Sequence, residues 1–123
     1  GRGFLTGAVK RAEAYPAEDW RHDDPRFQGN NFEINMRAAQ PVQDIADALN
    51  AKPGQIALAW LLHKGHGIVP IPGTKRREYL EENIAATAID LTTEQMRALE
   101  EALAPGRISG PRYNEERMAL VDR

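Results

Sequence analysis

The sequence contains no cysteine, which excludes disulfide bonds and thiolate metal sites and fits a reducing compartment. It has no uninterrupted apolar run near the roughly 18–20 residues that a membrane-spanning helix needs. It also has no large excess of either charge, because 16 basic and 18 acidic residues give a net charge of −2. Without a global basic field, nucleic acid is not an expected partner. These absences favour a cytoplasmic protein that binds neither nucleic acid nor a membrane.

Histidine is scarce as well, and its placement does not suggest a metal site. His22, His63 and His66, taken with Asp23 and Asp24, match no compact ligand spacing. What is present, 41% hydrophobic and 28% charged residues in a chain of 123, is typical of one soluble globular domain. We therefore predict a single globular unit without a metal.

The most informative stretch is residues 68–83, with the sequence IVPIPGTKRREYLEEN. Its apolar start at 68–72 predicts a strand buried on both faces, as in a parallel sheet. Gly73 permits close approach of the backbone to a ligand, and Thr74 can cap a following helix or donate a hydroxyl. Three cations at 75–77 come next, at the start of that helix.

These cations lie where a helix dipole is already positive, so they lower stability unless an anion offsets them. Free amides at the helix start and the planar donor fork of arginine both suit a phosphate. The residues alone leave two interpretations open. One is a phosphate-binding turn, and the other is a capped, solvated helix start after a buried strand.

The rest of the chain is mainly helical by its apolar spacing and its turn signals. Residues 8–30 are expected to form an irregular loop pinned by Trp20 and Phe27, and residues 3–6 a short strand end. Pro41 should kink or split the first helix. Helices are predicted at 31–50, at 55–64 after Pro53, from 75 or 76 to 86, after Thr92 or Thr93, and from Asn114. The helix at 55–64 is apolar on most sides and should be deeply packed.

This set of elements contains too few strands for a sheet. One strand at 68–72 and a possible one at 3–6 cannot close a sheet among about five helices. The chain is therefore expected to be either an unusual helical domain or part of a larger α/β protein.

Several motifs together resemble the C-terminal part of an aldo-keto reductase. They are GRGFLTG at 1–7, QIALAW at 55–60, IPGTKR at 71–76 and the pair Glu82-Asn83, in the order of that family. The resemblance implies an α/β fold, a (β/α)8 TIM barrel that typically needs about 250 residues. Residues 1–123 would then be the C-terminal fragment of a single barrel domain: the tip of strand 7, a long loop, helix 7, strand 8, helix 8 and extra C-terminal helices. Such a piece is an incomplete barrel on its own.

The same resemblance implies a site for NADP(H). The turn after strand 8 would hold the 2′-phosphate, the following helix would bond the adenine, and the first residues would lie against the pyrophosphate. The implied cofactor-binding residues are Gly73, Thr74, Lys75 and Arg76 for the 2′-phosphate, Glu82 and Asn83 for the adenine, and Gly1, Arg2 and Gly3 for the pyrophosphate. Because Tyr79 stands where many relatives carry arginine, the identity of the cation that clamps the phosphate stays open.

The chemistry of the family is hydride transfer from the nicotinamide to the carbonyl of an aldehyde or ketone. A tyrosine acid with lysine, aspartate and histidine neighbours assists it, and those four belong to earlier strands. Tyr15, Tyr79 and Tyr113 do not match that tyrosine, so no catalytic residue is assigned. The chain alone is expected to be inactive, with a small-molecule carbonyl as the substrate of the whole protein.

Two alternatives stay open. One is a non-catalytic, cofactor-sensing or regulatory subunit of the same fold, and the other is a helical module that binds another phosphorylated partner. For an incomplete barrel, the exposed sides of 68–72 and of the helix at 55–64 should drive contact with the missing N-terminal part or self-association.

Overall fold

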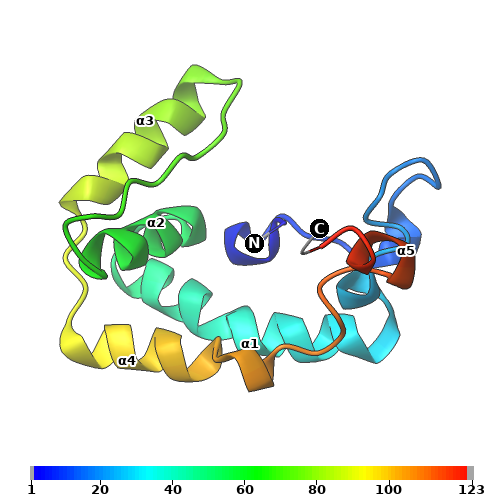
Figure 1. The fold of residues 1–123 in the computed structure, drawn as a ribbon. Coiled ribbons are helices and arrows are strands. Elements are labelled where there is room, and N and C mark those ends of the chain that lie inside the picture. Colours follow the sequence, from blue (N-terminus) through cyan, green and yellow to red (C-terminus); the bar gives the residue numbers. More distant parts are fainter. Residues whose placement is uncertain (1, 122–123) are drawn as a thin grey trace.

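The structure, a computed structural model, describes residues 2–121. Within these residues the fold is helical and contains no β-strand (Figure 1). The α-helices are α1 (Gly29–Ala48), α2 (Pro53–His63), α3 (Arg77–Ala85), α4 (Thr93–Ala102) and α5 (Glu115–Met118). Short 3-10 turns lie between them: η1 (Phe4–Thr6), η2 (Ala12–Ala14), η3 (Pro25–Phe27), η4 (Ala86–Ala88) and η5 (Pro105–Arg107).

Helices α1, α2 and α4 pack together into what we call the base. The buried residues of the base form one cluster: Val42, Ile45 and Ala46 from α1, Ile56 and Ala59 from α2, Leu91, and Leu99 from α4. In α1 these side chains recur at helical spacing, so one stripe faces the core while the opposite face stays polar. The apolar spacing that predicts this helix is therefore the spacing that builds the buried cluster of the base.

Helix α1 confirms the predicted helix but not a break at Pro41. The proline lies inside a single helical segment of 20 residues. On its exposed side, Gln40 donates to Asp44 Oδ1 and Gln43 donates to Asp47 Oδ1, both at 2.8 Å. The first of these contacts spans Pro41 and the second follows it, and side-chain pairs four residues apart stabilise a helix.

Helix α2 begins with Pro53 as predicted, but it is less deeply packed than its composition suggests. Its only fully buried residues are Ile56 and Ala59, while Leu62 is 37% exposed. The reason is that much of its apolar surface lines an open cavity instead of another helix. The prediction of deep packing on most sides is therefore wrong for this structure.

The end of α2 is held to the segment that leads into α4. The ring of His63 donates from Nδ1 to the carbonyl of Ala59 and accepts at Nε2 from the amide of Leu91. Lys64 Nζ lies 2.6 Å from Glu100 Oε1 on α4. Because both ring nitrogens of His63 form hydrogen bonds within the fold, this histidine has a structural role.

Residues 68–85 form a projection that we call the arm. An extended segment runs beside α3, and the two join at the tip of the projection (Figure 1). The strand predicted at 68–72 does not form here, because the described part of the chain offers it no partner strand. Helix α3 is present as predicted, yet it contains no buried residue.

The strand end predicted at 3–6 is also wrong for this structure. Those residues form the 3-10 turn η1, flanked by Gly3 at φ 96° and Gly7 at φ 71°. Both glycines are in the left-handed region, which other residues avoid. The glycines of the motif therefore close a tight turn instead of extending a strand.

The long loop and the C-terminal tail pack against each other beside the start of α1. Phe27 is fully buried, with the rings of Phe4, Tyr15 and Trp20 at 4.8, 5.9 and 6.2 Å. Trp20 itself stays 40% exposed. The loop is thus irregular and pinned by aromatic contacts, as predicted.

A buried amide joins the tail to α1. Asn35, which is 4% exposed, donates to the carbonyls of Arg26 and Ser109 and accepts from the amide of Ser109. The tail then ends in α5, whose first turn is capped by the side chain of Asn114. No helix in the described residues is both long and apolar enough to cross a bilayer.

Candidate cofactor-binding site

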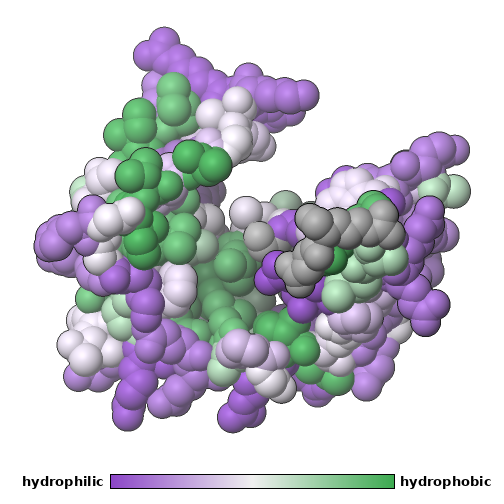
Figure 2. Space-filling model, in the orientation of Figure 1, coloured by the Kyte–Doolittle hydropathy of each residue, from purple (hydrophilic) through white to green (hydrophobic). Residues whose placement is uncertain are grey.

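One cavity of about 940 Å³ brings together residues that are far apart in the sequence. Arg2 and Gly3 reach it from the N-terminal turn, Gly73 from the arm, and Asn83 from α3. Figure 2 shows the molecule hollowed beside the arm, with hydrophobic surface inside the hollow. Four of the residues implied by the resemblance therefore share one concave surface.

The walls of the cavity are mostly apolar. Helix α2 contributes Ala57, Leu58, Trp60 and Leu61, α4 contributes Leu99, and Leu103 follows at the C-cap of α4. Trp60, in the helix expected to be deeply packed, is only partly buried, and its buried Nε1 has no hydrogen-bond partner within residues 2–121. An apolar wall with a few polar groups at its edge is the usual composition of a small-molecule site.

The cationic turn lies outside the cavity lining. Thr74, Lys75 and Arg76 are all exposed. Thr74 Oγ1 accepts a hydrogen bond from the Arg76 amide at 3.3 Å. Since Arg76 is itself the N-cap residue of α3 and no side chain caps that helix, Thr74 stabilises the turn and does not cap the helix.

The cations of this turn differ in their contacts. Arg77 forms an ion pair with Glu81 at 2.8 Å, one helical turn along α3. The guanidinium of Arg76 lies 5.6 Å from the ring centre of Tyr79. Lys75 forms no ion pair with any described residue. Lys75 and Arg76 thus keep charged donors available for an anion, whereas Arg77 is already paired.

Glu82 and Asn83, near the end of α3, have different surroundings. Asn83 lines the cavity, whereas Glu82 does not. The backbone carbonyl of Glu82 accepts from Gln55 Nε2 at 2.9 Å, which ties the arm to α2. Gly73 and Asn83 therefore lie on the same cavity although the turn and most of α3 separate them.

At the N-terminus, the Arg2 side chain is already engaged. Its Nη1 lies 2.6 Å from Oδ2 of Asp24 and also donates to the carbonyl of Arg112. Its guanidinium lies 4.3 Å from the ring centre of Tyr113. Gly1, the remaining residue of the pyrophosphate prediction, lies outside the described residues. The sequence does not indicate this contact of Asp24, because an aspartate before Pro25 indicates only a turn.

Side chains with shifted pKa values lie outside the cavity lining. Hydrogen bonds from Arg21 lower the pKa of Asp19 from 3.8 to about 2. Burial, and then the charges of Arg2 and Arg112, lower the pKa of Arg26. No tyrosine lines the cavity, and no group of three metal-ligating side chains occurs within residues 2–121. The groups with shifted pKa values therefore do not belong to the cavity lining.

Comparison with known proteins gives a consistent result. The model of the Aldo/keto reductase family matches residues 1–104. Aldo-keto reductase yakc [NADP(+)] of Schizosaccharomyces pombe is 45% identical over 113 residues, which are 92% of this chain and 33% of that protein. Aldo-keto reductase str7 of Strobilurus tenacellus is 37% identical over 122 residues, 99% of this chain and 36% of that protein.

A plant protein is similar as well. Probable aldo-keto reductase 1 of Glycine max is 37% identical over 113 residues, 92% of this chain and 32% of that protein. The chain thus spans about a third of the length of the curated relatives that it matches. No solved structure matches it.

Proposed function

The chain belongs to the aldo/keto reductase family, and on this premise we propose that it is the NADP(H)-binding part of an oxidoreductase that reduces aldehydes or ketones to alcohols. The observation that carries the proposal is the shared cavity of Arg2, Gly3, Gly73 and Asn83. The name of the relative in Schizosaccharomyces pombe, which specifies NADP(+), supports the choice of cofactor.

The turn of the arm is proposed to bind the 2′-phosphate of NADP(H). A 2′-phosphate carries about two negative charges, which call for extra cations near the ribose. Lys75 and Arg76 supply them, while Gly73 and Thr74 supply backbone and hydroxyl groups at the same turn. Because NAD(H) lacks this phosphate, these residues would give the protein its preference for NADP(H).

The remaining contacts are proposed to be common to both dinucleotides. Glu82 and Asn83 would bond the adenine, and Gly1, Arg2 and Gly3 would lie against the pyrophosphate. The placement of Asn83 and Gly3 on one cavity supports this division. When bound, the cofactor supplies a hydride to the carbonyl carbon of the substrate.

We further propose that the arm packs against the rest of a (β/α)8 barrel, or against a second copy when that part is missing. The large apolar residues that it exposes are Ile68, Val69, Ile71, Tyr79, Leu80 and Ile84. Figure 2 shows hydrophobic surface on this side of the molecule. Contiguous exposed apolar surface of this kind marks an interaction site. Intact-mass spectrometry of the purified protein, together with its size in solution, would reveal a second chain or self-association.

An enzyme assay tests the reductase proposal. NADPH oxidation is followed with a panel of aldehydes and ketones, for the complete protein and for residues 1–123 alone. We expect turnover by the complete protein and none by residues 1–123, because no catalytic tyrosine is assigned in the chain. Tight NADPH binding by the complete protein without turnover of any carbonyl would favour a cofactor-sensing role. Turnover by residues 1–123 alone would contradict the proposal that this chain binds the cofactor but lacks the catalytic residues.

A further inference from the structure

The N-terminal turn has an unusual backbone for its sequence. Arg2 adopts a φ of 53°, in the left-handed region that a residue with a Cβ rarely occupies. Gly3 follows at φ 96°, and its carbonyl accepts from both the amide and the hydroxyl of Thr6. This turn exposes Arg2 and Gly3 to the cavity. A non-glycine residue persists in such a conformation when its surroundings hold it there.

The side chain of Arg2 supplies the holding contacts. Asp24, whose side chain is only 1% exposed, accepts from Arg2 Nη1 at 2.6 Å. The carbonyl of Arg112 accepts from the same nitrogen, and the rings of Trp20 and Tyr113 lie 5.6 and 4.3 Å from the guanidinium carbon. The loop and the tail therefore converge on one guanidinium.

The carboxylate of Asp24 is itself fixed in place. Its Oδ1 accepts from the Arg26 amide at 3.0 Å, which caps η3, while its Oδ2 accepts from Arg2. One buried carboxylate thus links the first turn of the chain to the turn that precedes α1. Buried charges are retained when they are paired and hydrogen-bonded in this way.

We propose that Asp24 is a positioning residue for the dinucleotide, acting through Arg2. It holds the Arg2 guanidinium away from the ligand, so that the backbone of Arg2 and Gly3 faces the pyrophosphate in a preset conformation. This inference rests on the proposed function, because it assumes that the cavity takes a dinucleotide. It also changes the role of Arg2: the side chain is an anchor, and the contact with the cofactor comes from its backbone.

The inference predicts a specific pattern of cofactor affinity. NADPH and NADH share the pyrophosphate, so Asp24→Asn should weaken both by the same factor, about tenfold for loss of a buried charged pair. The ratio of the two dissociation constants should stay unchanged. The matched control is Asp23→Asn, which removes the same charge one residue earlier.

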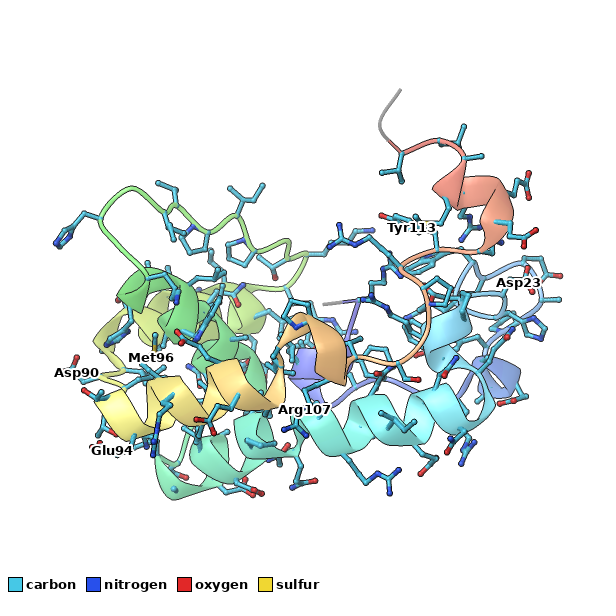
Figure 3. The ribbon with its side chains drawn as sticks, turned by 60° about the horizontal axis from the view of Figure 1, so that its bottom comes forward. Asp23, Asp90, Glu94, Met96, Arg107 and Tyr113 are labelled. Carbon is cyan, nitrogen blue, oxygen red and sulfur yellow. The ribbon has the colours of Figure 1, made fainter. Side chains whose placement is uncertain are left out.

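Asp23 is suited to that comparison. Its carboxylate is 64% exposed and pairs only with the neighbouring ring of His22, at 3.2 Å, among the described residues. Figure 3 places Asp23 on the outer side of the loop, whereas Tyr113 lies nearer the middle of the molecule. Fluorescence titration of the complete protein should therefore show unchanged affinity for both cofactors in the Asp23 variant. An unchanged affinity in Asp24→Asn, or a loss confined to NADPH, would overturn the inference.

A double-variant cycle tests whether Asp24 acts through Arg2. In an Arg2→Gln background the Asp24→Asn change should weaken cofactor binding by less than about twofold, since its partner is already gone. An equal loss in both backgrounds would show that Asp24 acts by another route and would overturn the assignment. Arg112→Ala is a further control that should leave both affinities unchanged, because Arg112 contacts Arg2 only through its backbone carbonyl.

Hydrogen exchange separates failure of this inference from failure of the proposed function. Without cofactor, the amide of Thr6 should exchange faster in Asp24→Asn than in the parent or in Asp23→Asn, because the turn is released. Faster exchange in a protein that binds no dinucleotide would contradict the proposed function while confirming the anchor. Unchanged exchange in a protein that binds NADPH would overturn the anchor alone. If Asp24→Asn does not fold, Arg2→Gln carries the same comparison.

Discussion

The base and the arm both carry apolar residues, but they use them differently. In the base, seven residues of α1, α2, α4 and the segment before α4 are buried in one cluster. In the arm, α3 buries no residue, and Ile71 is 92% exposed beside it. The base therefore stabilises itself, whereas the arm presents apolar side chains that nothing in the described chain covers.

This difference shows what a local sequence can achieve by itself. Helices α1, α2 and α4 all find packing partners within residues 29–102, so the buried apolar residues of the three helices meet in one cluster. The segment 68–72 is a strand by composition, and a strand needs a neighbour to complete its hydrogen bonds. The proposed ligand-binding turn therefore lies at the tip of the arm, away from the buried cluster of the base.

The largest expected effect comes from the core of the base. Ile56→Ala should lower the free energy of unfolding by about 2–5 kcal/mol, because Ile56 is fully buried and its truncation leaves a cavity. The matched change in the arm is Ile84→Ala, at a side chain 60% exposed, which should alter stability by less than about 0.5 kcal/mol. Urea unfolding followed by circular dichroism measures both. Similar losses at the two positions would mean that the arm is packed as tightly as the base.

A smaller effect on stability is expected from two threonines that precede helices, Thr92 before α4 and Thr74 before α3. Thr92 accepts from the amide of Gln95, whose side chain accepts in turn from the amide of Thr92. Thr92→Ala should therefore lower the free energy of unfolding by about 1 kcal/mol, and Thr92→Ser should restore most of it. Thr74→Ala, in the arm, should have little effect, because Thr74 caps no helix. A larger loss at Thr74 would refute the contrast.

Substitution on the arm should change association more than folding. Ile71→Ser removes an apolar side chain that contacts solvent, so the free energy of unfolding should change by less than about 0.5 kcal/mol. The same change should reduce self-association of residues 1–123, measured by sedimentation velocity, because it breaks the exposed apolar surface. Unchanged association would show that the arm is not the interacting surface.

The smallest effect on stability is expected from the ion pair of Asp19 and Arg21 in the loop, which is held by polar as well as aromatic contacts. The depressed pKa of Asp19 means that its contribution to stability is present above the ordinary value of 3.8 and is lost as the pH falls through about 2. NMR titration should find the Asp19 carboxyl near that lower value. Arg21→Gln should return it toward 3.8, and a pKa that stays low in this variant would exclude the hydrogen bonds from Arg21 as the cause.

The helices were predictable from the sequence because their signals are local. Pro53 and Thr92 mark helix starts by chemistry that acts within one turn, and the apolar spacing of α1 needs no knowledge of its partners. The strand at 68–72 was predicted but does not form, because pairing depends on a neighbour elsewhere. The sequence predicts a strand end where η1 forms, because two glycines around a short apolar segment suit either conformation.

The candidate site was predictable only in part, and for the same reason. The motif at 73–76 is a local pattern, whereas the role of the pair Glu82-Asn83 is implied only by the family resemblance. That Asn83 shares a cavity with Gly3 depends on how α2 carries the arm, which no local pattern encodes. The role of Asp24 was invisible, because its partner Arg2 is 22 positions away.

The central claim is that the tip of the arm recognises the 2′-phosphate of NADP(H). The most direct test is the pair of dissociation constants for NADPH and NADH, measured for the complete protein and for its Lys75→Ala, Arg76→Ala and Asn83→Ala variants. The two cation variants should weaken NADPH by about 1–3 kcal/mol and leave NADH nearly unchanged, while Asn83→Ala should weaken both. Equal losses of NADPH and NADH in the cation variants would contradict the claim.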